Sequence, residues 1–257
     1  MTTPFIDPSA TTLADAGFWI YVRQALYNST ISQEPLDLDL SLQLLPTPGS
    51  LQDSHPLAWL RVKTAWANHI LWNTALVADF CFSESKLPAL YSETARATRL
   101  QTWQELWDRN EAWRQNRPHE FDAIGEGPSN DSHVFRDIWF TADWHAISFT
   151  FYHFSCILLL RYKSASKFPI RWVNTELSPT DRKILQHARC ICSAVKSSLQ
   201  NAQLLIILCH TVFIWGPLMT DRREREEVLR LLGIFEDKHQ WRTSWIVEAL
   251  KEEWGTG

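Results

Sequence analysis

The stretch WHAISFTFYHFSCILLL, residues 144–160, decides the fold class of this chain. It contains no Asp, Glu, Lys or Arg, and its large apolar side chains fall on nearly every face of a helix. A helix that is apolar all round is buried, because no face of it suits water. The stretch therefore predicts a helix over about residues 135–162 at the centre of a helical bundle.

Helical periodicity continues through most of the chain, and strand patterns are nearly absent. Apolar residues at helical spacing predict further helices over residues 13–32, 56–82, 91–114, 178–215 with a bend near 199, 221–235 and 244–254. The clearest helix start is at Ser178, which suits an N-cap and is followed by Pro179 in the first turn. The prediction is an all-α fold, a single irregular helical bundle of about seven or eight helices in one domain over residues 1–257.

Three segments depart from the helical period. Residues 1–12 are expected to form a flexible N-terminus, and residues 117–134, which contain several Gly, Pro, Asn and Asp, a long surface loop. From Leu36 to Gln43, leucines alternate with polar residues. This segment is either an extended stretch laid on a helical surface or an acidic-hydrophobic stretch typical of activation domains. The packed stretch is favoured, since the alternation is short and no neighbouring strand is predicted.

The overall charge argues against direct binding of nucleic acid. The chain carries 25 basic and 29 acidic residues, a net charge of −4, with a pI near 6.1. Proteins that bind nucleic acid usually show a basic surplus or a basic stripe. The densest basic run, residues 222–227, mixes Arg with Glu and predicts a solvated helix face.

The five cysteines predict reduced thiols in a helical core. Their number is odd, no Cys-x-x-Cys pair occurs, and each lies in an apolar helical pattern. An intracellular protein of the nucleus or cytoplasm is therefore expected. Residues 197–220 carry no Asp, Glu, Lys or Arg, but they include Gln200, Asn201, His210 and Pro217. They predict a buried core helix, and no membrane span is expected.

The common catalytic and cofactor-binding loops are missing from the sequence. It contains no GxGxxG, GxxxxGK[ST], GxSxG or HExxH motif and no EF-hand loop. Asp108 and Glu111 are too isolated to form a magnesium-binding acidic cluster, and Glu111 is expected to pair with Arg114 one turn later. No cofactor and no metal site are therefore predicted.

A cluster rich in imidazole and aromatic rings supplies the candidate site residues. His145, Phe149, Tyr152 and His153 share one face of the central helix, and an aromatic-walled cavity forms if the helix that carries His210 is its neighbour. The acid–base candidates are His145, Tyr152, His153 and His210, and the ligand-binding candidates are Trp139, Trp144, Phe149 and Trp215. The alternative is hydrogen-bonded core histidines with aromatic packing, because no carboxylate is placed to orient either imidazole.

Several blocks of the chain form a familiar pattern in the order in which they occur. They are FWIYVRQALYN (18–28) with EPLDLD (34–39), WANHILW (66–72), Trp103 to Trp113 followed by Arg117-Pro118, Ile138-Trp139-Phe140 leading to His145 and Tyr152-His153, His187-Ala188-Arg189 with Ile191-Cys192, and Trp215-Gly216-Pro217-Leu218. Together they resemble the fungal-specific transcription factor domain family, the helical domain that usually follows a zinc binuclear cluster.

The resemblance implies an α-helical regulatory domain that serves effector sensing and self-association, while a separate module binds DNA. The zinc cluster needs six closely spaced cysteines, and none occurs before Phe18. We therefore expect a chain without its own DNA-binding module that starts part-way into the family's domain.

Two functions follow from these observations. The first is a regulatory or interaction domain that binds a protein partner or a second copy of itself, with a small apolar ligand as a further candidate. The second is a cofactor-independent enzyme of cyclase or isomerase type, acting on a small apolar substrate in a fungal biosynthetic pathway with His and Tyr as acid–base groups. Fold resemblance does not choose between them, because function depends on the site and not on the scaffold.

Overall fold

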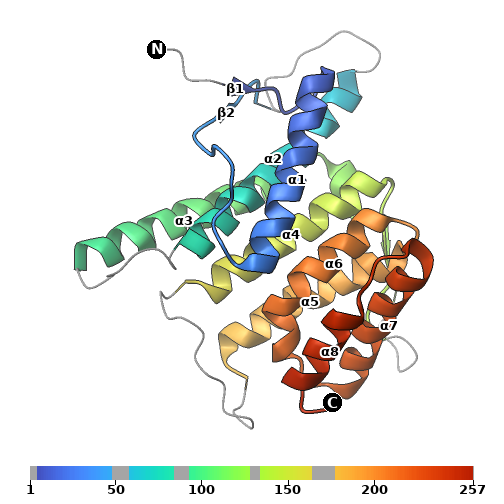
Figure 1. The fold of residues 1–257 in the computed structure, drawn as a ribbon. Coiled ribbons are helices and arrows are strands. Elements are labelled where there is room, and N and C mark those ends of the chain that lie inside the picture. Colours follow the sequence, from blue (N-terminus) through green and yellow to red (C-terminus); the bar gives the residue numbers. More distant parts are fainter. Residues whose placement is uncertain (1–4, 48–57, 84–92, 128–133, 164–176, 257) are drawn as a thin grey trace. The chain divides into compact units, whose positions relative to one another are not determined.

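Helices dominate the computed structural model, which describes residues 5–47, 58–83, 93–127, 134–163 and 177–256 (Figure 1). The chain divides into two compact units, Met1–His119 and Glu120–Gly257. Within the described residues lie eight α-helices and four strands of two residues each. The predicted all-α bundle class is therefore confirmed, while one domain over residues 1–257 stays a prediction.

The first unit is built on three helices and a short parallel pair of strands. Its elements are β1 (Phe5–Ile6), α1 (Leu13–Ser32), β2 (Gln43–Leu44), α2 (Ala58–Phe82) and α3 (Glu93–Asn116). Helix α2 packs against both α1 and α3. Trp19 of α1 is buried with its ring edge-on to Trp72 of α2, the ring centroids lying 6.1 Å apart. The predicted stripe of α1 therefore faces the core of this unit.

The leucine-rich segment after α1 lies extended on this unit. Leu36 is buried and its backbone N–H donates to Oδ1 of Asp79 at 3.2 Å, while Asp37 and Asp39 are exposed. The predicted packed stretch is confirmed over residues 34–47, and residues 48–55 lie outside the described residues. The pairing of this segment was not predicted. Its strand β2 lies parallel to β1, and β1 belongs to the residues that were expected to form a flexible N-terminus. Strands of two residues have no period from which a sequence pattern could reveal them.

The second unit surrounds one helix that is buried almost throughout. Its elements are β3 (Gly125–Glu126), β4 (Ile138–Trp139), α4 (Asp143–Arg161), α5 (Pro179–Ser197), α6 (Ala202–Trp215), η4 (Gly216–Leu218), α7 (Arg222–His239) and α8 (Ser244–Glu253), and η3 (His119–Phe121) lies at its boundary. Helix α4 packs on α5 and on α6, and α6 packs on α7 (Figure 1). Phe154, Ile157 and Leu158 of α4 have no exposed surface. The predicted central position of this helix is confirmed.

The predicted start of the central helix at about residue 135 is wrong, because α4 begins at Asp143. The preceding residues form β4, which pairs antiparallel with β3, and the backbone N–H of Ile138 donates to Oγ of Ser197 at 2.8 Å. The expected loop over 117–134 likewise contains η3 and β3, and its Phe121 is buried. Residues 128–133 of that loop lie outside the described residues. Tertiary hydrogen bonds thus draw residues 138 and 139 out of the helix.

The capping signal at Ser178 places the start of α5 accurately. Ser178 caps α5: its hydroxyl accepts from the backbone N–H of Asp181, whose carboxylate accepts from the N–H of Ser178. The predicted bend near residue 199 is a break, since α6 starts anew with Asn201 as its N-cap. At the far end of α6, a Cβ on Gly216 would lie 2.8 Å from Cδ2 of Leu250, so a larger residue here would require the Leu250 side chain of α8 to shift.

The Arg- and Glu-rich run at the start of α7 is not wholly solvated, contrary to the prediction. Glu224 is buried and accepts two hydrogen bonds from Arg189 of α5, at 2.6 Å from Nε and 3.2 Å from Nη2. These hydrogen bonds raise the pKa of Arg189 above its ordinary value. Arg222 and Glu226, by contrast, form an exposed pair of the expected kind. A bidentate pair of this sort fixes α7 on α5.

Two further sequence predictions are confirmed by the described residues. All five cysteines are outside disulfide bonds, and all but Cys190 are buried. Arg114 pairs with Glu111 at 3.0 Å, as the spacing predicted. Among the described helices none is long and apolar enough to cross a membrane, and α6 ends after 14 residues.

Replacing the cap of α5 tests whether this local signal stabilises the second unit. We expect Ser178→Ala to lower the free energy of unfolding by about 1 kcal/mol, because the backbone N–H of Asp181 loses its acceptor. Urea unfolding followed by far-UV circular dichroism measures the change. Ser178→Thr keeps the hydroxyl and should stay close to wild type, and equal stability of all three proteins would contradict the assignment.

Candidate functional site

The candidate His145 is held inside the protein at the first turn of α4. It is 1% exposed, its Nδ1 lies 2.8 Å from Oγ1 of Thr141, and its ring packs on Phe121 with centroids 4.4 Å apart. The neighbouring Trp144 is 39% exposed and presents its ring to solvent. His145 therefore joins the segment before α4 to the helix itself, which is the arrangement of a hydrogen-bonded core histidine.

His153 meets a histidine that was not among the candidates. Its Nδ1 lies 2.8 Å from Nδ1 of His187 on α5, and both side chains are half-buried. Phe149 packs edge-on against His153 at 4.3 Å, and Phe140 extends this contact at 5.1 Å from Phe149. The signal that could have revealed His187 is its place between Ile184 and Ile191 on the buried face of α5.

His210 lies elsewhere in the interior of the second unit. It is 2% exposed, and its ring contacts Phe154 of α4, with centroids 5.9 Å apart. Burial lowers the pKa of His210 to about 3, so this imidazole is neutral at physiological pH. Phe154 and His153 are consecutive residues and point about 100° apart around the helix. His210 therefore contacts Phe154, whereas His153 meets His187 on α5.

The other candidates divide between core and surface. Trp215 is fully buried, and its Nε1 donates to Oγ1 of Thr211 within the same helix at 3.3 Å. Tyr152 is buried beside His153, with ring centroids 5.2 Å apart. Trp139 is 48% exposed and packs over Gly125 of the paired strand. The structure thus brings Phe149, Tyr152 and His153 together, while Trp139 and Trp215 lie in different surroundings.

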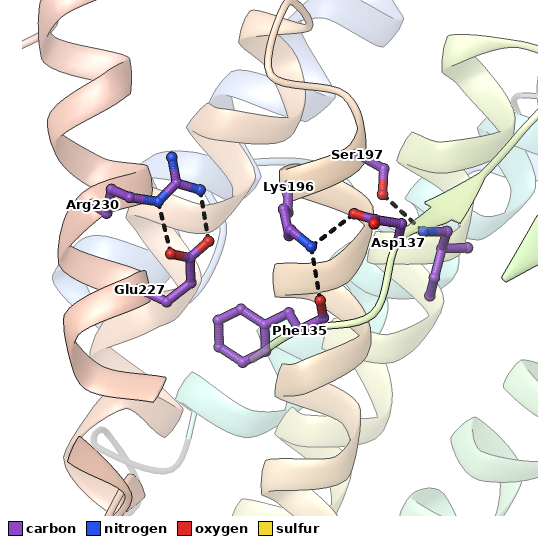
Figure 2. A network of polar contacts seen from close by, with 7 residues as sticks. Phe135, Asp137, Lys196, Ser197, Glu227 and Arg230 are labelled. Atoms are coloured by element: carbon purple, nitrogen blue, oxygen red, sulfur yellow. Dashed lines mark hydrogen bonds and ion pairs between the residues drawn. The ribbon is translucent and has the colours of Figure 1, made fainter. Parts of the chain in front are cut away.

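A polar network missed by the sequence reasoning ties the β4 segment to α5. Figure 2 shows Nζ of Lys196 between the backbone carbonyl of Phe135, at 3.0 Å, and Oδ1 of Asp137, at 2.8 Å. Ser197 accepts from the N–H of Ile138 in the same network. The Lys196 side chain is 13% exposed, so water screens this pair only weakly. The network holds the segment that leads into α4 against the end of α5.

The chemistry that these residues offer comes from imidazole nitrogens and aromatic faces. No group of three or more His, Cys, Asp or Glu side chains suited to a metal ion occurs in the described part of the chain. The hydroxyl of Thr141 lies within hydrogen-bond distance of His145, and the imidazole of His187 lies within hydrogen-bond distance of His153. In the half-buried pair of His153 and His187, two imidazole nitrogens lie next to each other and are partly open to solvent.

Comparisons with known proteins add no further constraint. No family model, no curated protein and no solved structure matches the chain. The resemblance to the fungal transcription factor domain stays a prediction that rests on the residue blocks alone.

Removing the cation of the network tests its contribution to the second unit. Lys196→Met keeps the length of the apolar stem but leaves Asp137 and the carbonyl of Phe135 without the ammonium. We expect a loss of about 1–3 kcal/mol in the free energy of unfolding, measured by urea titration. Arg222→Met is the matched control, because its 90% exposed pair should contribute less than about 0.5 kcal/mol. Equal effects of the two substitutions would contradict this role.

Acidification should destabilise the folded chain through His210. The unfolded state binds a proton near the ordinary pKa of 6.5, whereas the folded state takes it up only near 3. Stability from this group is therefore complete above about pH 6.5 and falls as the pH decreases toward 3. Between pH 7 and pH 5 the loss is about 2 kcal/mol.

The measurement is urea unfolding at pH 7 and pH 5, followed by tryptophan fluorescence, for wild type and His210→Met. The variant lacks the titrating group and should lose about 2 kcal/mol less than wild type on acidification. His69, whose pKa burial lowers to about 4, stays in both proteins and cancels in the comparison. The same loss in both proteins would show that His210 takes up its proton as readily in the folded state as in the unfolded state.

Proposed function

We propose that the chain is a regulatory and interaction domain of the fungal transcription factor type, one that acts through protein contacts. The observation that carries the proposal is that the candidate catalytic groups are engaged by the protein's own core. His145 bonds to Thr141, His153 to His187, and Trp215 fills the interior of its helix bundle. Side chains that pack on one another in this way favour a structural role over a reaction with a bound substrate.

Exposed aromatic side chains of the second unit support a surface for a partner. Trp241 is 40% exposed and stacks on Phe235 at 5.8 Å, and Trp245 is 45% exposed and stacks on Phe213 at 5.2 Å. Stacking holds these indoles in place, so binding costs little side-chain entropy. Tryptophan is among the residues most enriched at the energetic centres of protein interfaces. A protein partner or a second copy of the chain fits this surface.

The net charge of −4 supports the absence of direct nucleic-acid contact in this proposal. The five cysteines outside disulfide bonds support a reducing compartment, which we propose to be the nucleus or the cytoplasm. A small apolar effector remains part of the proposal as a ligand of the aromatic interior.

The alternative proposal is a cofactor-independent cyclase or isomerase of a fungal biosynthetic pathway. One observation favours it: burial keeps His210 neutral, with a pKa of about 3, in an interior lined by aromatic rings such as Phe154. A neutral imidazole in such surroundings can orient a mostly apolar substrate by hydrogen bonding to one polar group on it. This proposal requires the product profile of the producing strain to change in His145→Ala and His210→Ala variants.

The regulatory proposal is tested by fusing the full chain to a heterologous DNA-binding domain and measuring a reporter gene. We expect reporter output to differ from that of the DNA-binding domain alone, because a regulatory domain recruits or masks partners. Replacing Trp241 and Trp245 together with Ser should bring the output back to that baseline, since the stacked indoles form the contact surface. Trp59→Ser, at a 52% exposed position of the first unit, is the matched control and should keep the wild-type output.

Light scattering of the purified chain separates the two kinds of partner. A dimer that dissociates in the Trp241→Ser, Trp245→Ser protein indicates a second copy, whereas a monomer with reporter activity indicates a different protein. Reporter output equal to the baseline, together with altered products in the His variants, would exclude the regulatory proposal in favour of the enzyme.

A further inference from the structure

His153 and His187 form a close pair of imidazole nitrogens, and they come from different helices. His153 lies in the middle of α4 and His187 in the middle of α5, the two helices that pack most closely in the second unit. Their Nδ1 atoms are 2.8 Å apart, and their ring centroids are 5.1 Å apart. The two nitrogens therefore lie between the rings and face each other across the helix interface.

Either a proton or a metal ion can lie between the two Nδ1 atoms. Without an ion, one neutral ring must carry its proton on Nδ1 and donate it to the other ring. When both rings carry their proton on Nε2, two lone pairs converge on one point, which is the form of imidazole that binds a metal ion. We propose that His153 and His187 together bind a divalent transition metal ion, of which Zn²⁺ and Cu²⁺ are the best suited, through their Nδ1 atoms.

The geometry requires only a small adjustment to hold such an ion. At a zinc–nitrogen distance of about 2.0–2.1 Å, two tetrahedral ligand nitrogens lie about 3.3–3.4 Å apart. The observed 2.8 Å must therefore widen by about 0.5 Å. Side-chain rotation of two half-buried rings supplies this without moving either helix. Water fills the other coordination positions, since both rings are partly open to solvent.

The surroundings of the pair select the kind of metal. Phe149 packs edge-on against His153 at 4.3 Å, and Tyr152 lies at 5.2 Å, so aromatic rings flank that imidazole. The two protein ligands are nitrogen atoms, and imidazole suits Zn²⁺ and Cu²⁺, whereas Mg²⁺ and Ca²⁺ require oxygen ligands. The inference revises the sequence-based expectation of no metal site, and it does not depend on the proposed function.

Binding of the metal alone to the full chain tests the proposal. Zn²⁺ is titrated into the purified protein by calorimetry, and we expect one ion per chain. His153→Gln and His187→Gln should each lower the affinity by roughly tenfold or more, because each removes one of two ligands. His119→Gln, at an exposed histidine outside the pair, is the matched control and should keep the wild-type affinity. Circular dichroism of each variant confirms that it is folded.

Electron paramagnetic resonance of the Cu²⁺-loaded protein identifies the ligands directly. Coupling of the copper electron to two imidazole nitrogens is expected in wild type, and to one in each single variant. The proposal is overturned if wild type binds neither ion, or if the two variants bind as tightly as wild type. In that case the pair is a hydrogen bond between α4 and α5 and nothing more.

Discussion

The burial of α4 between α5 and α6 is the constraint on which the second unit depends. A helix with apolar side chains on almost every face needs neighbours on more than one side, and α5 and α6 supply them. Leu158 of α4, Ile191 of α5 and Leu208 of α6 have no exposed surface. The outer helix α7 then docks on α5 and α6, with the bidentate pair of Arg189 and Glu224 fixing its place. The aromatic and imidazole side chains take their positions from this packing.

The same constraint explains why the histidines of α4 find partners within the protein. A polar group carried into a close-packed interior costs free energy unless it is hydrogen-bonded there. Thr150 bonds back to the carbonyl of Ile147, His145 bonds to Thr141, and His153 reaches across the helix interface to His187. Among these, the pair of His153 and His187 differs in being half-open to solvent. One helix therefore carries both a fully buried imidazole, His145, and a half-buried imidazole pair, His153 with His187.

Prediction succeeded where the signal is local and failed where it is not. The bounds of α1, the Ser178 cap and the pairing of Glu111 with Arg114 follow from residues within four positions of each other. The start of α4 was placed too early because Ile138 bonds to Ser197, 59 residues along the chain. A solvated face was likewise expected at Glu224, because its partner Arg189 lies on another helix, 35 residues away in the chain. Of the candidate site residues, Phe149 and Tyr152 contact His153, whereas His145 contacts Thr141 and Phe121.

The sequence by itself determined the helical class and the central place of residues 144–160. Periodicity and composition determine these properties, and both can be read from neighbouring residues. Only the tertiary structure decided which imidazole meets which. His187 lies 34 positions from His153 and becomes its partner because α4 and α5 pack with those two turns in register. That register depends on how whole side-chain surfaces interlock, and no local pattern encodes it.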